Sequence, residues 1–340
     1  MIRKESITSH ISVRIEDASQ VGEARRAATM LAQEAGFNET ETGKVAIVAT
    51  ELATNIVKHA QRGEVLVRIL DQQGNCGVEV LALDSGPGMV DMQQTMRDGF
   101  STSGTPGTGL GAVRRLASVF DVYTSAGGGA CALAQLWSRP LKPVSRGTTY
   151  GVVCRPVAGE QVCGDCWGIV QRSPAELIMV ADGLGHGPLA GDASEAAVRV
   201  LQENASRSIG DILQLAHSAL RSTRGAAVAI AEISNHERVV RFVGVGNILA
   251  SILSEGTSRS LVSHNGIVGH QVRKIQEFQY PWPKGSTLIM ASDGLHTQWN
   301  LDKYPGLLRR HPGLIAAVLY RDYCRGRDDA TVLVACDNSV

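Results

Sequence analysis

The sequence predicts a two-domain α/β protein, and three observations support this fold class. The chain has 340 residues, which is about the length of two typical domains. Residues 138–148 hold two prolines and three cations without hydrophobic periodicity, which is typical of a linker. Residues 1–137 mix helical and strand patterns, whereas residues 149–340 are richer in strands. We therefore expect one domain on each side of the linker.

The first domain is predicted to be a two-layer α/β sandwich. Alternating apolar residues predict strands at 11–15, 65–70, 78–84, 121–124 and 131–137. Helical periodicity predicts helices over 21–33, 40–60 and 110–119. Gly36 follows the first helix as a stop signal, and a glycine-rich loop precedes the last one. These elements indicate helices packed on a mostly antiparallel sheet.

The second domain is predicted to contain two packed sheets with helices outside. Its strands are expected at 148–155, 166–171, 176–181, 226–234, 239–245, 248–253, 287–292 and 330–334. Its helices are expected at 189–204, 209–221 and 313–323. Residues 177–184 and 288–295 are similar in sequence, since each is an apolar strand that ends in Asp-Gly-Leu.

Composition excludes several functional classes. The 33 basic and 33 acidic residues cancel, and aromatic residues are only 4%, which argues against a nucleic-acid or anionic-membrane binder. The chain has no apolar run of the ~18–20 residues that a membrane span needs. It also shows no signal-peptide pattern. We therefore expect a cytoplasmic protein with reduced thiols. Cys163 and Cys166 form a C-x-x-C pair, which we expect to be small buried residues rather than a metal or redox site.

Polar residues recur along the predicted helix 40–60. Glu51, Asn55 and His59 stand at i, i+4 and i+8, and each step of four advances only ~40°, so they form one stripe. A carboxylate and an amide beside a buried face can hold a divalent cation and a hydroxyl. Taken alone, the stripe is more typical of a solvated helix edge.

Two glycine-rich segments follow this helix. Residues 84–89, Asp-Ser-Gly-Pro-Gly-Met, place a carboxylate at a strand end beside glycines that let a flat ring such as adenine approach. Residues 99–111 run into a helix, where main-chain N–H groups favour phosphate. The spacing of Gly107, Gly109 and Gly111 is not that of a Rossmann fingerprint, and the segment is not a Walker loop.

These three elements, in this order, resemble the GHKL superfamily of ATPases and kinases. Residues 51–55, 84–88 and 107–111 look like its N, G1 and G2 boxes, and residues 5–137 are most similar to the small RsbT/RsbW-type serine/threonine kinases. The resemblance implies a GHKL (Bergerat) sandwich in which Glu51 is the general base, Asn55 a Mg²⁺ ligand and Asp84 the adenine contact. It implies ATP and Mg²⁺ as cofactors, with further binding residues His59, Gly86, Gly88, Ser101, Thr102, Gly107, Thr108, Gly109, Leu110 and Gly111. Ala130 departs from the family, since a threonine is expected there, and this weakens a nucleotide contact.

Acidic residues recur at four places in the second domain, several of them at the ends of predicted strands. Gathered carboxylates are costly unless cations pair with them, and oxygen ligands suit Mg²⁺ or Mn²⁺. Two such ions can activate water and stabilise a phosphoryl transition state. A single Asp-Gly pair would indicate only a turn. The four places are Asp165, Asp182-Gly183, Asp293-Gly294 and Asp328-Asp329.

The order and spacing of these acidic segments resemble the PPM-type protein serine/threonine phosphatases, in particular the SpoIIE/RsbX branch, over residues 147–336. The resemblance implies a PPM-type β-sandwich flanked by helices, with two Mn²⁺ or Mg²⁺ ions. Asp182 would bridge them, the Gly183 carbonyl would bind one, and the remaining site residues would be Asp165, Asp293, Asp328 and the neighbouring Asp329. Two roles stay open for His186, which could act on the phosphate or leaving group, or only cap the helix that follows. Residues 244–247 look structural and are assigned no chemistry.

Together the two resemblances predict a bifunctional regulator. The first domain would phosphorylate, and the second dephosphorylate, a serine or threonine of a STAS-domain protein in a partner-switching or stressosome-type pathway. Neither nucleic acid nor membrane is an expected partner, and an oligomer stays open. In one alternative the first domain is a nucleotide sensor or an anti-sigma docking module and the protein is only a phosphatase. In another the whole chain is a non-enzymatic scaffold, which the four acidic segments argue against.

Overall fold

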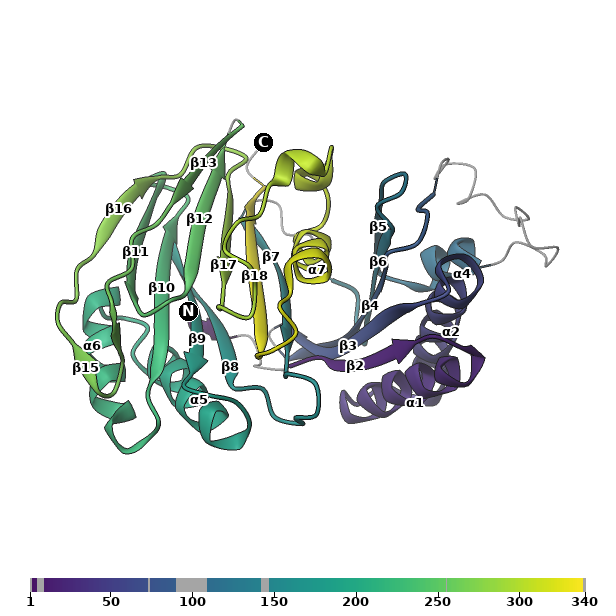
Figure 1. Ribbon diagram of the computed structural model, residues 1–340, viewed down its shortest axis with the longest axis horizontal. Coiled ribbons are helices and arrows are strands. Elements are labelled where there is room, and N and C mark those ends of the chain that lie inside the picture. Colours follow the sequence, from purple (N-terminus) through teal and green to yellow (C-terminus); the bar gives the residue numbers. More distant parts are fainter. Residues whose placement is uncertain are drawn as a thin grey trace. The chain divides into compact units, whose positions relative to one another are not determined.

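The computed structural model describes residues 2–4, 9–72, 74–89, 109–141, 147–254 and 256–338 (Figure 1). They divide into two compact units, each assembled from separate stretches of the chain. The first unit comprises His10–Pro143 and Leu301–Arg321. The second unit comprises Met1–Ser9, Val144–Asn300 and Asp322–Val340. Leu301–Arg321 thus lies inside the predicted second domain in sequence, yet packs with the first unit.

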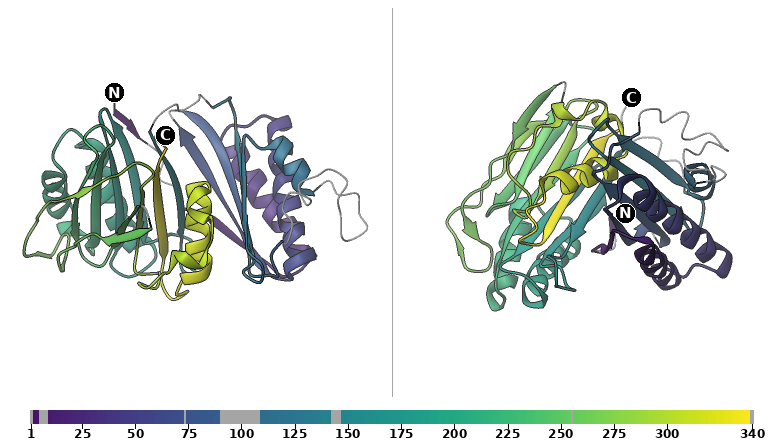
Figure 2. Two further views of the ribbon diagram at one scale, coloured as in Figure 1. Left: turned by 90° about the horizontal axis from the view of Figure 1, so that it is seen from above. Right: turned by 45° about the vertical axis from the view of Figure 1, so that its right-hand side comes forward.

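The first unit is built on a five-stranded antiparallel sheet. Its spatial order is β2 (Ile11–Ile15), β3 (Gly63–Gln72), β4 (Asn75–Asp84), β6 (Ala130–Trp137) and β5 (Val119–Thr124). Three helices pack on it: α1 (Ala18–Glu34), α2 (Glu39–Asn55) and α4 (Gly109–Leu116). Figures 1 and 2 show α1 and α2 side by side on one face. The core between these layers includes Leu31, Val48, Leu52, Val65 and Val80, which are all buried. The predicted α/β sandwich is confirmed.

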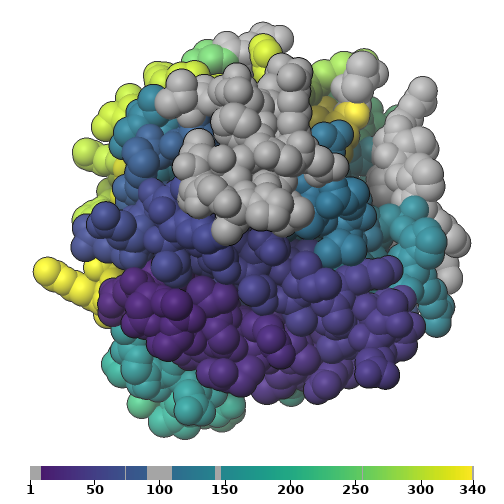
Figure 3. Space-filling model, turned by 90° about the vertical axis from the view of Figure 1, so that its right-hand side faces the viewer, coloured from purple at the N-terminus to yellow at the C-terminus, as the bar shows by residue number. Residues whose placement is uncertain are grey.

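Capping residues determine where the first two helices begin. Asp17 and Asn38 each form a reciprocal capping box, with Gln20 and Glu41 as the third helical residues. Such caps contribute about 1 kcal/mol each because they satisfy otherwise free N–H groups. α1 ends where Gly36 adopts φ +78°. On the outer side, α1 and α2 form the continuous purple-to-blue surface of Figure 3.

Two predicted helix ends in the first unit are corrected by the structure. The helix expected over 40–60 stops at Asn55 and continues as one wide π-helical turn, Ile56–Ala60. The helix expected over 110–119 ends at Leu116, because Val119 is already the first residue of β5. Hydrophobic periodicity does not distinguish such a wide turn from an α-helix, and it locates helix ends poorly.

The other face of this sheet is covered by Leu301–Arg321. Most of α7 (Pro312–Tyr323) belongs to this segment, and Figure 2 shows the yellow α7 on the side opposite the purple α1 and α2. The Asp121 carboxylate accepts hydrogen bonds from the His311 main-chain N–H at 2.8 Å and from Arg310 Nη1 at 3.2 Å. The hydroxyl of Tyr320 donates to Glu64 Oε2 at 3.2 Å. Contacts far apart in sequence therefore hold this segment on the sheet.

A buried charge network lies on the same sheet. The side chain of Glu79 is completely buried. Its carboxylate accepts from Arg68 Nε and from Gln135 Nε2, both at 2.7 Å. Burial raises the pKa of Glu79, but the charges of Arg68 and His10 outweigh burial and hold the pKa well below its usual range.

The second unit contains two facing sheets with a shared core. One sheet has the order β1 (Ile2–Lys4), β8 (Asp165–Arg172), β9 (Ala175–Gly183), β10 (Ala226–Ser234), β11 (Val239–Val245) and β16 (Phe278–Pro281). The other has the order β13 (Thr257–Ser260), β12 (Leu249–Ser254), β17 (Thr287–Ala291), β18 (Ala330–Asp337) and β7 (Thr148–Arg155). Trp167, Phe242, Trp282, Met290 and Leu333 are buried between them. This is the expected pair of packed sheets.

Helices α5 (Pro188–Glu203) and α6 (Ile209–Ala219) cover the outer face of the first of these sheets. A 3₁₀ turn, Leu220–Ser222, follows α6. The smaller elements are the hairpin β14 (Gly266–Ile267) and β15 (Gln271–Val272) and two 3₁₀ turns at Leu301–Lys303 and Leu307–Arg309. In the part of the chain that the structure describes, no helix is both long and apolar enough to cross a membrane.

Candidate functional site

Glu51 and Asn55, from the predicted polar stripe, meet the start of α4. A Cβ added to Gly109 would lie 3.4 Å from Glu51 Oε2 and 3.5 Å from Asn55 Oδ1. Glycine at this position therefore lets the main chain of α4 approach both side chains. The Asn55 Nδ2 atom is buried and makes no hydrogen bond to any described residue. A buried amide of this kind is suited to a polar ligand or a hydrated cation.

Asp84 is held at the end of β4 by the turns around it. Its Oδ1 atom accepts from the N–H groups of Gly86 at 2.9 Å and Ala130 at 3.2 Å. Burial raises the pKa of Asp84, while these hydrogen bonds and the charges of Arg321 and His59 oppose the rise. The second carboxylate oxygen is left to accept from a ligand such as an amino-substituted ring.

The glycines around Asp84 are required by close packing. A Cβ at Gly86 would lie 2.7 Å from the Cβ of Ala60. Gly88 has φ +73°, and a Cβ there would collide with the main chain of Ser125. Gly129, with φ +71°, lies equally close to the main chain of Asp84. These glycines keep three main-chain segments in contact beside the carboxylate.

Four predicted nucleotide contacts, Ser101, Thr102, Gly107 and Thr108, lie outside the described residues. Leu110 and Gly111 are described, and both are buried in α4. His59 is exposed on the π-helical turn, and its charge acts on Asp84. The structure therefore brings Glu51, Asn55 and Gly109 together.

The acidic segments of the second unit meet at the ends of strands from both sheets. Asp165 begins β8 and lies directly opposite Asp182 of β9 in the strand register. Burial raises the pKa of Asp182 to about 9, and the charges of the other four carboxylates add to the effect. Burial likewise raises the pKa of Asp165 to about 7, and the charges of Asp329 and Asp328 contribute. All five carboxylates therefore lie in one mutually repelling cluster.

Hydrogen bonds orient three of these carboxylates. Asp329 is buried and accepts from the N–H groups of Val157 at 2.7 Å and Gly164 at 2.8 Å. Asp165 Oδ2 accepts from the hydroxyl of Ser292 at 2.6 Å. Asp293 Oδ2 accepts from Asn247 Nδ2 at 2.6 Å. Asp329 thus connects two loops through its carboxylate.

Gly183 lies where α5 packs against the end of β9. A Cβ at Gly183 would collide with the main chain of Ala190. The N–H of Gly183 donates to the carbonyl of Gly164 at 3.1 Å. Glycine is therefore required here for packing, and its own carbonyl remains a candidate ligand.

The chemistry of this cluster fits hard divalent cations. The donors are carboxylate oxygens, and their mutual repulsion raises pKa values that a bound cation would lower. Among the described residues, no three His, Cys, Asp or Glu side chains already surround one point as ligands.

His186 lies at the start of α5, and its Nδ1 is 2.8 Å from Glu160 Oε1. The N-terminal cap of α5 is Gly187, and no side chain forms a capping hydrogen bond there. The structure therefore gives no support to the capping role that the sequence left open. His186 is exposed, and its charge acts on Asp329.

Cys163 and Cys166 are both buried, as expected. The sulfur neighbour of Cys163 is Cys154, at 3.7 Å, rather than Cys166. None of the seven cysteines, all of which the structure describes, forms a disulfide.

Comparison with known proteins assigns both halves of the chain. Residues 15–135 match the family described as "Histidine kinase-like ATPase domain", and residues 175–336 match "Stage II sporulation protein E (SpoIIE)". The serine/threonine-protein kinase RsbT of Bacillus subtilis (strain 168) is 35% identical over 127 residues, which are 37% of this chain and 96% of RsbT. The phosphoserine phosphatase RsbX of the same strain is 31% identical over 140 residues, which are 41% of this chain and 70% of RsbX. The chain belongs to both families. It fuses an RsbT-like, kinase-like ATPase domain to a SpoIIE/RsbX-type phosphatase domain.

A solved structure shares the fold of about half of this chain. A chain described under "The bacterial stressosome: a modular system that has been adapted to control secondary messenger signaling" is 27% identical, with a TM-score of 0.53. The similarity covers 56% of this chain and 99% of that one.

Sequence reasoning missed two positioning residues in these domains. Asn247, which was assigned no chemistry, holds Asp293 of the phosphatase domain. Arg321 donates to the main-chain carbonyl of Asp84 in the first unit. The only available signal for Asn247 was its place directly after two strand-end glycines, and Arg321 had none.

Proposed function

We propose that the protein is a bifunctional regulator of a partner-switching or stressosome-type pathway. The kinase-like domain would phosphorylate, and the phosphatase domain dephosphorylate, a serine or threonine of a STAS-domain protein. The observation that carries this proposal is the joining, in one chain, of a glycine-lined carboxylate site at Asp84 with a five-carboxylate cluster around Asp182. The identities to RsbT and RsbX support one target class for both activities.

In the phosphatase domain, Asp182, Asp165, Asp293, Asp328 and the Gly183 carbonyl would hold Mn²⁺ or Mg²⁺. Bound ions of this type activate water and neutralise developing phosphoryl charge. Asp329 would position the loops that carry Asp165, since its carboxylate binds the N–H of the preceding Gly164. Asn247 would orient Asp293. His186, held by Glu160, would donate a proton to the leaving oxygen or bind the phosphate.

In the kinase-like domain, Glu51 would accept the proton of the target hydroxyl. Asn55 would bind the Mg²⁺ that accompanies ATP, and Asp84 would accept from the adenine amino group. The main-chain N–H groups at the start of α4, including Gly109, would face the phosphates. These roles agree with the meeting of Glu51, Asn55 and Gly109.

A second candidate function is a phosphatase whose kinase-like domain only senses nucleotide. Ala130 favours it, because this residue supplies a main-chain N–H to Asp84 but no side-chain hydroxyl. A phosphate-transfer assay distinguishes the two functions. It incubates the protein with labelled ATP, Mg²⁺ and the STAS-domain proteins encoded beside this gene. The assay uses Asp182→Ala, so that dephosphorylation does not remove the label, and compares it with Asp182→Ala/Glu51→Ala.

Label on serine or threonine that disappears with Glu51→Ala supports the bifunctional regulator. No label, with nucleotide still bound, supports the sensor. Wild-type protein that fails to release phosphate from the labelled target with Mn²⁺ contradicts both.

A further inference from the structure

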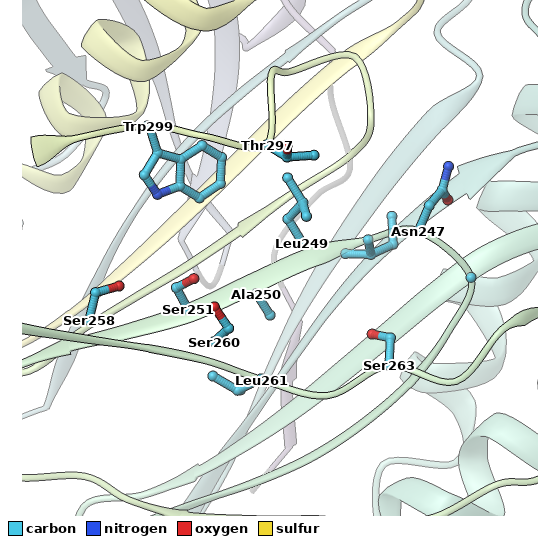
Figure 4. Close-up of a pocket in the computed structure, with 12 residues that line it drawn as sticks. Asn247, Leu249, Ala250, Ser251, Ser258, Ser260, Leu261, Ser263, Thr297 and Trp299 are labelled. Carbon is cyan, nitrogen blue, oxygen red and sulfur yellow. The ribbon is translucent and has the colours of Figure 1, made fainter.

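A cavity of about 380 Å³ opens beside the carboxylate cluster of the second unit. This is within the size range of ligand-binding pockets. Its lining comes from the hairpin β12–β13, the turn before β12 and the chain after Asp293. Figure 4 shows Asn247 and Ser263 at one end and Trp299 over the hydroxyls of Ser251, Ser258 and Ser260 at the other.

Asn247 connects this cavity with the phosphatase site. It lines the cavity, and its Nδ2 donates to Asp293 Oδ2 at 2.6 Å. Thr297 and Trp299 line the cavity as well, and they follow Asp293 on the same loop. A molecule that reaches from Asp293 into the cavity therefore stays in contact with one continuous surface.

The lining carries no charged side chain, and its polar groups alternate with the apolar side chains of Ile248, Leu249, Ala250 and Leu261. Five hydroxyl groups face the space, together with the Asn247 amide and the Trp299 indole, and no acidic or basic side chain takes part. The Oγ atom of Ser263 is buried and has no hydrogen-bond partner among the described residues. A ligand that supplies hydrogen-bonding groups without a net charge suits such a lining, because a charged group would lose its hydration without gaining a counter-charge.

The cavity also borders the end of a sheet. β13 is the terminal strand of its sheet, pairs with β12 and is exposed along its length. Ser260 faces Ser251 in the register, so the hydroxyls of both strands lie on one face. An exposed edge strand offers main-chain N–H and C=O groups to an added extended segment.

We propose that this cavity binds the residues that flank the phosphorylated side chain of the protein substrate, as an extended segment of uncharged polar residues. The proposal rests on the proposed phosphatase function, because the phosphoryl group must lie at Asp293 and its neighbours. The cavity then selects among phosphoproteins by the residues beside the phosphoserine.

The test uses three nine-residue phosphoserine peptides, flanked by Ser, Thr and Asn, by Glu, or by Lys. We expect kcat/KM, measured with Mn²⁺, to be about tenfold higher for the uncharged peptide than for either charged one. In Ser260→Leu and Trp299→Ala this ratio should fall to near one. The control Ser206→Leu alters an exposed serine remote in sequence from the cavity and should keep the wild-type ratio. Equal rates on all three peptides, or a preference unaffected by both cavity variants, would overturn the proposal.

A binding measurement separates this proposal from the phosphatase function. Trp167 and Trp282 are buried in the core and Trp137 belongs to the first unit, so quenching of the half-buried Trp299 reports on the cavity. The uncharged peptide should quench the fluorescence of the hydrolysis-deficient Asp182→Asn protein, and the quenching should disappear in Asp182→Asn/Trp299→Phe. If wild-type protein hydrolyses neither the peptides nor p-nitrophenyl phosphate, the phosphatase function fails, while quenching still decides whether the cavity binds. Peptide binding with no Trp299 response overturns the cavity assignment.

Discussion

The guanidinium of Arg321 donates a 2.9 Å hydrogen bond to the main-chain carbonyl of Asp84, although 237 residues separate them in sequence. Both belong to the first unit. The side-chain carboxyl of Asp84 is the candidate adenine contact, and the charge of Arg321 counteracts the rise in its pKa that burial causes. A residue late in the chain therefore positions the main chain of the candidate nucleotide contact Asp84.

Arg321→Ala should weaken nucleotide binding. The variant removes a charge-assisted hydrogen bond, which contributes about 1.5–3 kcal/mol, so ADP affinity should fall about tenfold or more. Isothermal titration with Mg²⁺-ADP measures it. Arg309→Ala is the matched control, because Arg309 is an exposed arginine of the same segment. An unchanged affinity in Arg321→Ala would show that the hydrogen bond is irrelevant to the site.

Gly129→Ala should disrupt the turn beside Asp84. Gly127 and Gly129 have nearly the same positive φ, +72° and +71°, but only a Cβ at Gly129 meets the main chain of Asp84, and nothing lies within 4 Å of one at Gly127. Both alanine variants carry the cost of the left-handed conformation, about 1–2 kcal/mol. Gly129→Ala should lose clearly more stability and most ADP binding. Thermal unfolding and ADP titration of both variants check this, and equal losses would contradict the close approach.

Divalent cations should stabilise the phosphatase domain. The carboxylates around Asp182 repel one another, so Mn²⁺ or Mg²⁺ that binds only the folded state should add about 2.7 kcal/mol at a hundredfold excess over Kd. Calorimetric melting with and without chelator measures the increase in Tm. Asp182→Asn should abolish most of the increase, and Asp192→Asn, at an exposed carboxylate of α5, should retain it. If neither Mn²⁺ nor Mg²⁺ changes the Tm of the wild-type protein, the metal site is refuted.

Glu79 should make the first unit sensitive to acid. Its folded-state pKa lies below the unfolded value of 4.5, so the stabilisation it provides is present above about pH 4.5 and is lost as pH falls further. Glu79→Gln leaves the buried Arg68 without its carboxylate, which should cost about 3–5 kcal/mol at pH 7. Urea unfolding from pH 7 to 3 should show the two proteins converging below pH 4.5. The control Glu23→Gln, on the exposed side of α1, should follow wild type throughout. Parallel curves for Glu79→Gln and wild type would exclude a lowered pKa.

Much of the fold and of both sites is predictable from local sequence. Strands such as Ala226–Ser234 and Val239–Val245 were predicted residue for residue, because uninterrupted apolar and β-branched runs between turn signals are a local property. The short strands β13–β16 were missed, because two to four residues carry no periodicity. The acidic segments were recognisable since each Asp stands beside a glycine or a second Asp at a strand end.

The sequence by itself determined the two fold classes, the order of the motifs and the five carboxylates of the second unit. Only the tertiary structure decided that Leu301–Arg321 packs on the sheet of the first unit, that Arg321 meets Asp84 and that Asn247 holds Asp293. The physical reason is that hydrophobic period, caps and glycine turns act over a few neighbouring residues. The position of a distant helix on one face of a sheet depends instead on the sum of many weak contacts. These contacts join side chains that become neighbours only after the chain has folded.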